Sequence, residues 1–356
     1  MTKFFTPISV SDDYFKRIDL STKKQKIIRF LQTIKNLKIN PQLLWESRYW
    51  GKGVGAFQIE GNFLAKNLWQ PVIVKIQGPK PQISEVKIIS LFEKQNQSSI
   101  IKTPKVFFFQ PWKKNLGFEI IIFEKVNADF IIKPHIPTKL KQLKEFFSIY
   151  QEYRQKALNK PFFEKKSINN FSYQNLFHKW QKIRQENSLS YLIDQKEDQF
   201  LKQIASFLDK VFRTVPLEFQ HRHLSVYDIK KTPNNNYYLF SNLFWGCGWP
   251  LYDIVFGFMW FILGLAEYET SVIEKQIKLW EQTIHQTVKN TPKILNKFKQ
   301  KTKIYLHLAF LERYLAALNL DILMINKKEN ILKIKPLLKK QIKSYYQLAL
   351  KELNEA

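Results

Sequence analysis

The sequence has almost no cysteine and no long hydrophobic run. Its single cysteine, Cys247, excludes an internal disulfide and any zinc site built from cysteines, and it fits a reducing, intracellular location. The most apolar stretch, residues 254–266, has 13 residues. This is too short for a membrane-spanning helix, so a buried core helix is predicted there. The first residues, MTKFFTPISVSDDYFKRI, lack the hydrophobic core of a secretory signal. These absences predict a cytoplasmic protein with no membrane span.

Acidic residues are also scarce. The chain has 30 Asp and Glu against 57 Lys and Arg, which gives a formal net charge of +27. Such a charge is typical of a protein with an acidic partner, which here means nucleic acid, a phosphate-bearing substrate or an anionic membrane. Glycine numbers only 10 while Lys, Ile, Asn and Phe are abundant, which is the profile of an AT-rich genome. Compositional bias is the favoured interpretation, because Lys outnumbers Arg and a phosphate-clamping surface would favour Arg.

The length and hydrophobic content predict a large folded core. With 356 residues, 45% of them hydrophobic, the chain has room for two domains or one bilobal domain, and global disorder is excluded. Apolar residues at helical spacing predict helix within residues 10–38. Strands are predicted over 43–51, 54–61, 69–78, 103–110 and 116–126, with a helix beginning near Pro81. Together they predict a five-stranded antiparallel sheet with one inserted helix, followed from residue 138 by helices.

Two features of this strand-rich part favour contact with phosphate. Gly51, Gly53 and Gly55 lie between the first two strands, where backbone N–H groups could approach phosphate oxygens. An ordinary hairpin turn is the alternative. Lys75 is the lone charge in an apolar strand, and Glu85 lies at the start of the next helix, so the two could pair. The alternative is a lysine that reaches solvent from an edge strand and a glutamate that stabilises a helix N-terminus.

The stretch 217–253, LEFQHRHLSVYDIKKTPNNNYYLFSNLFWGCGWPLYD, contains a His-rich turn, a hairpin and the start of an apolar helix. Its layout resembles the catalytic segment of the aminoglycoside and choline phosphotransferase family. In that family H-G-D-x-H-x-x-N is followed by a strand with a metal-binding Asp and then by G-D-P-x-x-D. His221 falls on the first His, and Asp253 falls on the final Asp, which supports the loop backbone. Both are therefore expected to be structural.

The resemblance implies a bilobal, protein-kinase-like α+β fold. A helical extension is expected over 1–40, a sheet lobe over 41–126 and a larger helical lobe over 127–356. In such a fold the strand lysine holds the nucleotide phosphates and the helix glutamate fixes the lysine, which are roles for Lys75 and Glu85. Backbone groups of Glu124 and Val126, at the end of the last strand, would contact adenine. ATP and Mg²⁺ are the implied cofactors, with a nucleotide, a small ligand or a protein as partner.

The same alignment shows substitutions at the chemical positions. His223 replaces the catalytic Asp that accepts the substrate hydroxyl proton, and Asp228 replaces the metal-binding Asn. Ser241 or Asn242 stands where the second metal-binding Asp is expected. A hydroxyl or amide binds Mg²⁺ more weakly than a carboxylate because it adds no charge. We therefore expect His223 and Asp228 to be the candidate catalytic pair, with Asp228 as the remaining metal ligand.

Three functions are compatible with these residues. The leading hypothesis is a catalytically impaired, phosphotransferase-like protein that binds a nucleotide, small ligand or partner between its lobes. The second is an active small-molecule phosphotransferase, with His223 as general base and Asp228 on the metal. The third is a basic nucleic-acid-associated protein, against which stands the lack of a recognised binding motif.

Overall fold

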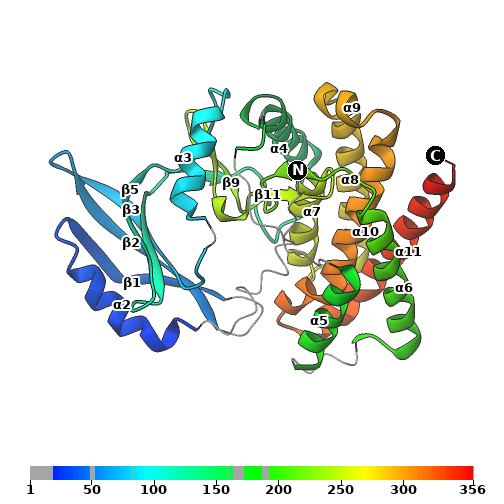
Figure 1. Ribbon diagram of the computed structural model, residues 1–356, viewed down its shortest axis with the longest axis horizontal. Helices are drawn as coiled ribbons and strands as arrows, with labels where there is room; N and C mark the ends of the chain where they lie inside the picture. The colour runs from blue at the N-terminus through cyan, green and yellow to red at the C-terminus, as the bar shows by residue number, and fades with distance from the viewer. Residues whose placement is uncertain are drawn as a thin grey trace.

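The chain folds into two lobes, as Figure 1 shows: a sheet lobe at one end and a bundle of helices at the other. The structure is a computed structural model that describes residues 19–48, 53–81, 83–158, 160–162, 172–186 and 192–355. The sheet lobe comes from the first part of the chain, and the helices come from the second. The predicted bilobal α+β fold is confirmed. None of the helices in the described ranges is long and apolar enough to cross a lipid bilayer.

The sheet lobe contains the predicted antiparallel sheet. Within the described ranges its order is β1-β2-β3-β6-β5, and each neighbouring pair is antiparallel. Helix α3 (Glu85–Gln95) is inserted after β3, and the Ser84 side chain caps its first turn by accepting the Lys87 N–H. The strands are β1 (Leu37–Arg48), β2 (Val54–Ala65), β3 (Leu68–Gln77), β5 (Val106–Lys113) and β6 (Phe118–Glu124).

One face of the sheet is covered by helix α2 (Lys24–Gln32), which follows the short turn η2 (Ser21–Lys23). Ile27 and Leu31 of α2 pack among buried residues of the sheet. The helix predicted to residue 38 was too long, because β1 already begins at Leu37 and pairs with Phe63 of β2. Apolar residues at this point fit both periods, and cross-strand pairing decides between them. Residues 10–18 of that prediction lie outside the described ranges.

The helical lobe is built around two buried helices. Helix α7 covers most of the apolar stretch predicted to be a core helix, and α10 packs against it. Both are buried on almost every side, as expected for helices at the centre of a bundle. The α- and π-helical segments are α4 (Leu140–Glu152), the π-helical turn η3 (Tyr153–Ala157), α5 (Tyr173–Glu186), α6 (Gln195–Phe212), α7 (Tyr252–Gly264), α8 (Thr270–Lys289), α9 (Pro292–Phe298), α10 (Thr302–Asn319) and α11 (Lys328–Asn354).

Short strands connect the two lobes. The predicted hairpin within 230–240 forms from β9 (Ile229–Lys231) and β10 (Tyr237–Leu239). Strand β10 also pairs in parallel with β4 (Ile101–Lys102), which follows α3 in the chain, and β9 pairs with β7 (Asp129–Phe130) inside the predicted linker. The remaining short elements are β8 (Glu218–Gln220), β11 (Gly246–Gly248) and the 3₁₀ turns η5 (Asn242–Phe244), η6 (Lys299–Lys301) and η7 (Asp321–Met324). Such two- and three-residue strands have too little periodicity to be predicted from sequence.

Helix α7 lies against the loop 221–228 at a glycine. A Cβ atom at Gly257 would be 2.7 Å from the carbonyl oxygen of Leu224 and 3.2 Å from the Cα of Ser225. We therefore expect Gly257→Ala to force helix and loop apart and lower the free energy of unfolding by about 1–3 kcal/mol, measured by urea denaturation. Gly264→Ala is the control, since its Cβ would meet only the exposed side chain of His135. Equal losses for the two variants would contradict this close approach.

Candidate functional site

A cavity of about 400 Å³ lies where the sheet lobe meets the loops of the helical lobe. Its wall includes residues of β2 and β3, the start of α3, the segment after β6, and the region around β9 and β10. The predicted site residues that line it are Lys75, Glu85, Glu124, Val126, Asp228, Ser241 and Asn242. The structure therefore brings together, in one cavity, positions that are up to 167 residues apart in the chain.

Lys75 and Glu85 form an ion pair inside this cavity. The Lys75 Nζ lies 2.6 Å from Glu85 Oε2, and the two side chains are 19% and 4% exposed. The other oxygen, Glu85 Oε1, accepts the backbone N–H of Asn242 at 3.0 Å. A buried carboxylate needs such partners, because an isolated buried charge is strongly unfavourable. Glu85 thus fixes the position of the Lys75 ammonium and at the same time ties α3 to the segment after β10.

The segment after β6 offers a backbone donor to the cavity. The Glu124 N–H donates to the Lys105 carbonyl at 2.9 Å, and the Lys125 N–H donates to the Pro71 carbonyl at 2.9 Å. The Val126 N–H, in contrast, has no acceptor among the residues that the structure describes. Val126 itself lines the cavity.

The predicted glycine turn is described only in part. Gly51 lies outside the described ranges. Gly53 and Gly55 are buried, and Gly55 is already inside β2, where its carbonyl accepts the Gly78 N–H at 2.9 Å. Neither of these two glycines contributes to the wall of the cavity. Their predicted contact with a nucleotide therefore stays a prediction.

The backbone of the loop 221–228 is held by Asp253, at the start of α7. Asp253 Oδ2 accepts the His221 N–H at 2.8 Å and the Tyr153 hydroxyl at 3.0 Å, and Oδ1 accepts the Arg222 N–H. Arg222 has φ = 67°, a conformation that favours glycine, and it occupies the position where the family pattern has Gly. The His221 ring is fully buried and lies 3.0 Å from the Phe240 carbonyl oxygen. Burial lowers the pKa of His221 to about 4, so the ring is neutral at pH 7.

His223 and Asp228 lie side by side in this loop. The His223 Nδ1 is 3.1 Å from Asp228 Oδ2, and the same oxygen accepts the N–H of Ser225 at 3.1 Å and the Ser225 hydroxyl. Burial alone would raise the pKa of Asp228, but the His223 imidazole and the Ser225 hydroxyl outweigh burial and hold it below its usual value. The His223 ring stacks on Phe244 at 4.4 Å between centroids. His223 itself does not line the cavity, whereas Asp228 does.

The oxygen donors at the two positions expected to bind metal are partly engaged within the protein. Asp228 already uses one oxygen for His223 and Ser225. The Asn242 amide is turned away into the helical lobe, where it donates to the Leu239 carbonyl at 2.9 Å and accepts the Trp245 indole N–H at 3.2 Å. Over the described ranges, no group of three or more His, Cys, Asp and Glu side chains could hold a metal ion. A hard dication prefers several oxygen ligands and at least one free carboxylate.

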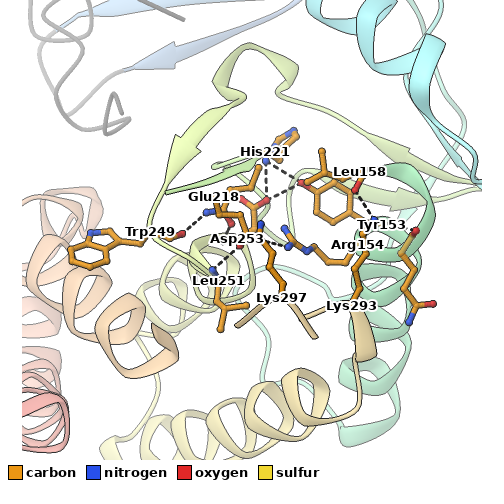
Figure 2. Close-up of polar contacts among 12 residues, drawn as sticks. Tyr153, Arg154, Leu158, Glu218, His221, Trp249, Leu251, Asp253, Lys293 and Lys297 are labelled. Atoms are coloured by element: carbon orange, nitrogen blue, oxygen red, sulfur yellow. Dashed lines mark hydrogen bonds and ion pairs between the residues drawn. The ribbon is translucent and has the colours of Figure 1, made fainter. Parts of the chain in front are cut away.

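A buried ionic network lies next to the loop 221–228, and Figure 2 shows how its members converge. The Arg154 guanidinium, from η3, donates to Glu218 Oε1, which also accepts from the Lys297 ammonium at 2.8 Å. The second oxygen of Glu218 accepts the Leu251 N–H at 3.0 Å. This network could not be predicted from the sequence. Its partners lie 64 and 79 residues apart, so no pattern within one segment could pair them.

Trp249 replaces an Asp in the family pattern, and its surroundings explain how that is accommodated. Its side chain is fully buried, with its ring 5.9 Å from Tyr173 and 5.2 Å from Phe212 between centroids. Its backbone carbonyl accepts the Gln220 side-chain amide. The position therefore faces the core of the helical lobe rather than the cavity, where an aromatic side chain contributes packing and a carboxylate would be unfavourable.

Comparisons with known proteins give distant likenesses. No family model matches the sequence, and no curated protein is detectably similar to it. Among solved structures, a choline kinase from Cryptosporidium parvum has a TM-score of 0.49 at 14% identity, covering 95% of this chain and 99% of that one. An ethanolamine kinase from Plasmodium vivax has a TM-score of 0.48 at 12% identity, with 87% and 81% covered. A choline kinase from Streptococcus pneumoniae has a TM-score of 0.47 at 12% identity, with 91% and 100% covered.

Two of these structures are choline kinases. The motif layout in the sequence resembles the aminoglycoside and choline phosphotransferase family. Each TM-score is below 0.5 and each identity is below 15%. The assignment of the fold therefore depends on the strand order and the contacts described above, and the likenesses add no argument about ligand or reaction.

The network around Glu218 makes a testable prediction. Glu218→Gln would leave the buried Arg154 without its charged partner, so we expect a loss of about 3–5 kcal/mol in the free energy of unfolding by urea denaturation. Lys297→Met is the control and should lose much less, because the Lys297 side chain is 48% exposed.

The same carboxylate gives the direction of a pH effect. Burial alone would raise the pKa of Glu218, but Arg154 and Lys297 outweigh it and hold the pKa below its ordinary 4.5. A group with a lowered folded-state pKa stabilises the fold above its unfolded pKa. The wild-type advantage over Glu218→Gln should therefore shrink as the pH falls below about 4.5. A constant difference down to pH 3 would contradict this account.

Proposed function

We propose that the cavity between the lobes binds a nucleotide or a related phosphate-bearing small molecule, and that phosphoryl transfer is impaired. The observation that carries this proposal is the Lys75 ammonium, held in the cavity by Glu85 at 2.6 Å. An ammonium fixed in this way is suited to a phosphate oxygen. The Val126 N–H, in the same wall, is suited to the edge of a base. A volume of about 400 Å³ is in the usual range for small-molecule sites.

Impairment of transfer follows from the charges around the phosphate position. Phosphoryl transfer from ATP depends on metal ions that neutralise developing charge. Of the two positions expected to bind metal, one is the neutral Ser241 or Asn242, and the other is Asp228, which is engaged by His223 and Ser225. The cavity therefore holds an ammonium suited to an anion, and of the two positions expected to bind a dication only one, Asp228, carries a carboxylate, which His223 and Ser225 already engage.

The proposal predicts metal-independent binding of ATP that requires Lys75. Lys75→Met should weaken ATP binding by about 10- to 100-fold in isothermal titration calorimetry, since a hydrogen bond to a charged group contributes about 1.5–3 kcal/mol. Because this change leaves Glu85 buried without its ammonium, the double variant Lys75→Met/Glu85→Gln should be tested beside it. Lys80→Met, at an exposed position outside the cavity wall, is the matched control and should bind as the wild type does.

Two results would contradict the binding proposal. One is ATP affinity in Lys75→Met equal to that of the wild type, with the variant folded by circular dichroism. The other is a wild-type chain that binds no adenine nucleotide at all, which would favour a protein partner in place of a nucleotide.

The contact between His223 and Asp228 favours a second candidate function, an active small-molecule phosphotransferase. Asp228 accepts from one ring nitrogen of His223 at 3.1 Å, which orients the ring and leaves the other nitrogen for a substrate hydroxyl proton. In this candidate His223 would act as the general base in place of a carboxylate, and Asp228 would set its tautomer.

One set of measurements separates the two candidates. For the impaired protein we expect the ATP-induced rise in Tm to be the same with Mg²⁺ and with EDTA, and we expect no transfer to alcohol or amine substrates. The active candidate requires the opposite: a rise in Tm that depends on Mg²⁺ and is lost in Asp228→Ala, and transfer that is abolished in His223→Ala. Transfer that persists in His223→Ala would exclude this role for His223.

A further inference from the structure

Glu119 is a buried carboxyl group close to the Lys75–Glu85 pair. It lies on β6, opposite Gln77 of β3, and is 1% exposed. Within the described part of the chain, neither of its carboxyl oxygens accepts a hydrogen bond. A buried carboxylate without donors is strongly unfavourable, so the group needs either a partner or a proton.

The register of the sheet places Glu119 on the same face as Lys75. Lys75 is opposite Ile121, and Gln77 is opposite Glu119, two residues further along each strand. Since alternate residues of a strand point to the same side, Glu119, Ile121 and Lys75 share one face. Ile121 packs with Ile89 of α3, so this is the face that α3 covers. Glu119 therefore lies between the sheet and the helix that carries Glu85.

The charged groups that act on Glu119 are Lys75 on β3 and Glu85 on α3. Both oxygens of Glu85 are engaged, one with the Lys75 ammonium and one with the Asn242 N–H. The Lys75 ammonium therefore interacts with two carboxyl groups, those of Glu85 and Glu119. Burial, together with the charge of Glu85, raises the pKa of Glu119 to about 7, although Lys75 opposes the rise.

We propose that Glu119 is the proton-bearing member of this three-group cluster and that its proton sets the charge that an anion meets in the cavity. With Glu119 protonated, the charges of Lys75 and Glu85 sum to zero, and the cluster does not repel a phosphate. With Glu119 ionised, the cluster carries one net negative charge and repels a phosphate. The part that concerns ligands rests on the proposed function above, whereas the proton on Glu119 does not.

The ligand-dependent test is ATP binding at pH 6 and pH 8 by calorimetry, for the wild type and Glu119→Gln. The wild type should lose affinity between these pH values by about tenfold more than the variant, because only the wild type gains a charge near the phosphate. The titration of ATP itself is common to both proteins and cancels in the comparison. Glu46→Gln, a carboxyl group of β1 outside the cavity wall, is the control and should follow the wild type. An equal pH dependence in wild type and Glu119→Gln would overturn the proposal.

A second measurement needs no ligand. A carboxyl group with a raised folded-state pKa destabilises the fold progressively as the pH rises from its unfolded to its folded value, because the unfolded chain ionises first. Relative to Glu119→Gln, the wild type should therefore lose stability between pH 4.5 and about 7. Its unfolding equilibrium constant should rise by at least about tenfold more than that of the variant.

The two measurements distinguish the possible failures. If ATP does not bind but the stability difference appears, the proposed function fails while the proton on Glu119 is supported. If the stability difference does not appear, the inference about Glu119 is overturned whatever the ATP result. Glu119→Met, of similar length and without charge, is the second variant to use if Glu119→Gln does not fold.

Discussion

The Glu85 carboxylate is the interaction on which the arrangement of the site depends. One oxygen holds the Lys75 ammonium and the other holds the backbone of Asn242, so a single group joins β3, α3 and the segment after β10. Because Glu85 is almost completely buried, neither contact can be exchanged for water without a large loss. Both contacts lie at the cavity, whose wall also includes the end of β6 and Asp228.

Compared with the family pattern that the sequence resembles, the groups that hold the loop backbone are present, whereas the positions expected to perform chemistry carry other residues. Asp253 accepts two successive backbone N–H groups, and Arg222 adopts the positive φ at the place where the family pattern has glycine. An arginine in that conformation is strained, and the surrounding hydrogen bonds maintain it. His223 and Trp249 occupy two of the positions where the sequence differs from the family pattern. One replaces a carboxylate with an imidazole beside Asp228, and the other fills a core position with an aromatic ring.

Local patterns in the sequence were sufficient for the sheet, the inserted helix, the central apolar helix and the Lys75–Glu85 contact. These features depend on the period of one segment, or on a motif whose order along the chain matches its order in space. What could not be predicted depends on pairing between distant segments. Glu119 reads as an ordinary residue of an apolar strand until the register places it beside Lys75. Glu218 and Arg154 meet only because η3 and β8 pack together.

The parallel ladder between β4 and β10 has a mechanical consequence. Ile101 and Tyr237 pair at the boundary of the lobes, and the Tyr237 N–H also donates to the Ile100 carbonyl at 2.8 Å. The Glu85–Asn242 contact joins the lobes near the same ladder, and two bodies joined along such a short boundary rotate about it more easily than they slide along it or separate. Any opening that admits a ligand should therefore be a swing about an axis close to these residues, with its largest displacement at the far tips of the sheet, near the turn between β2 and β3.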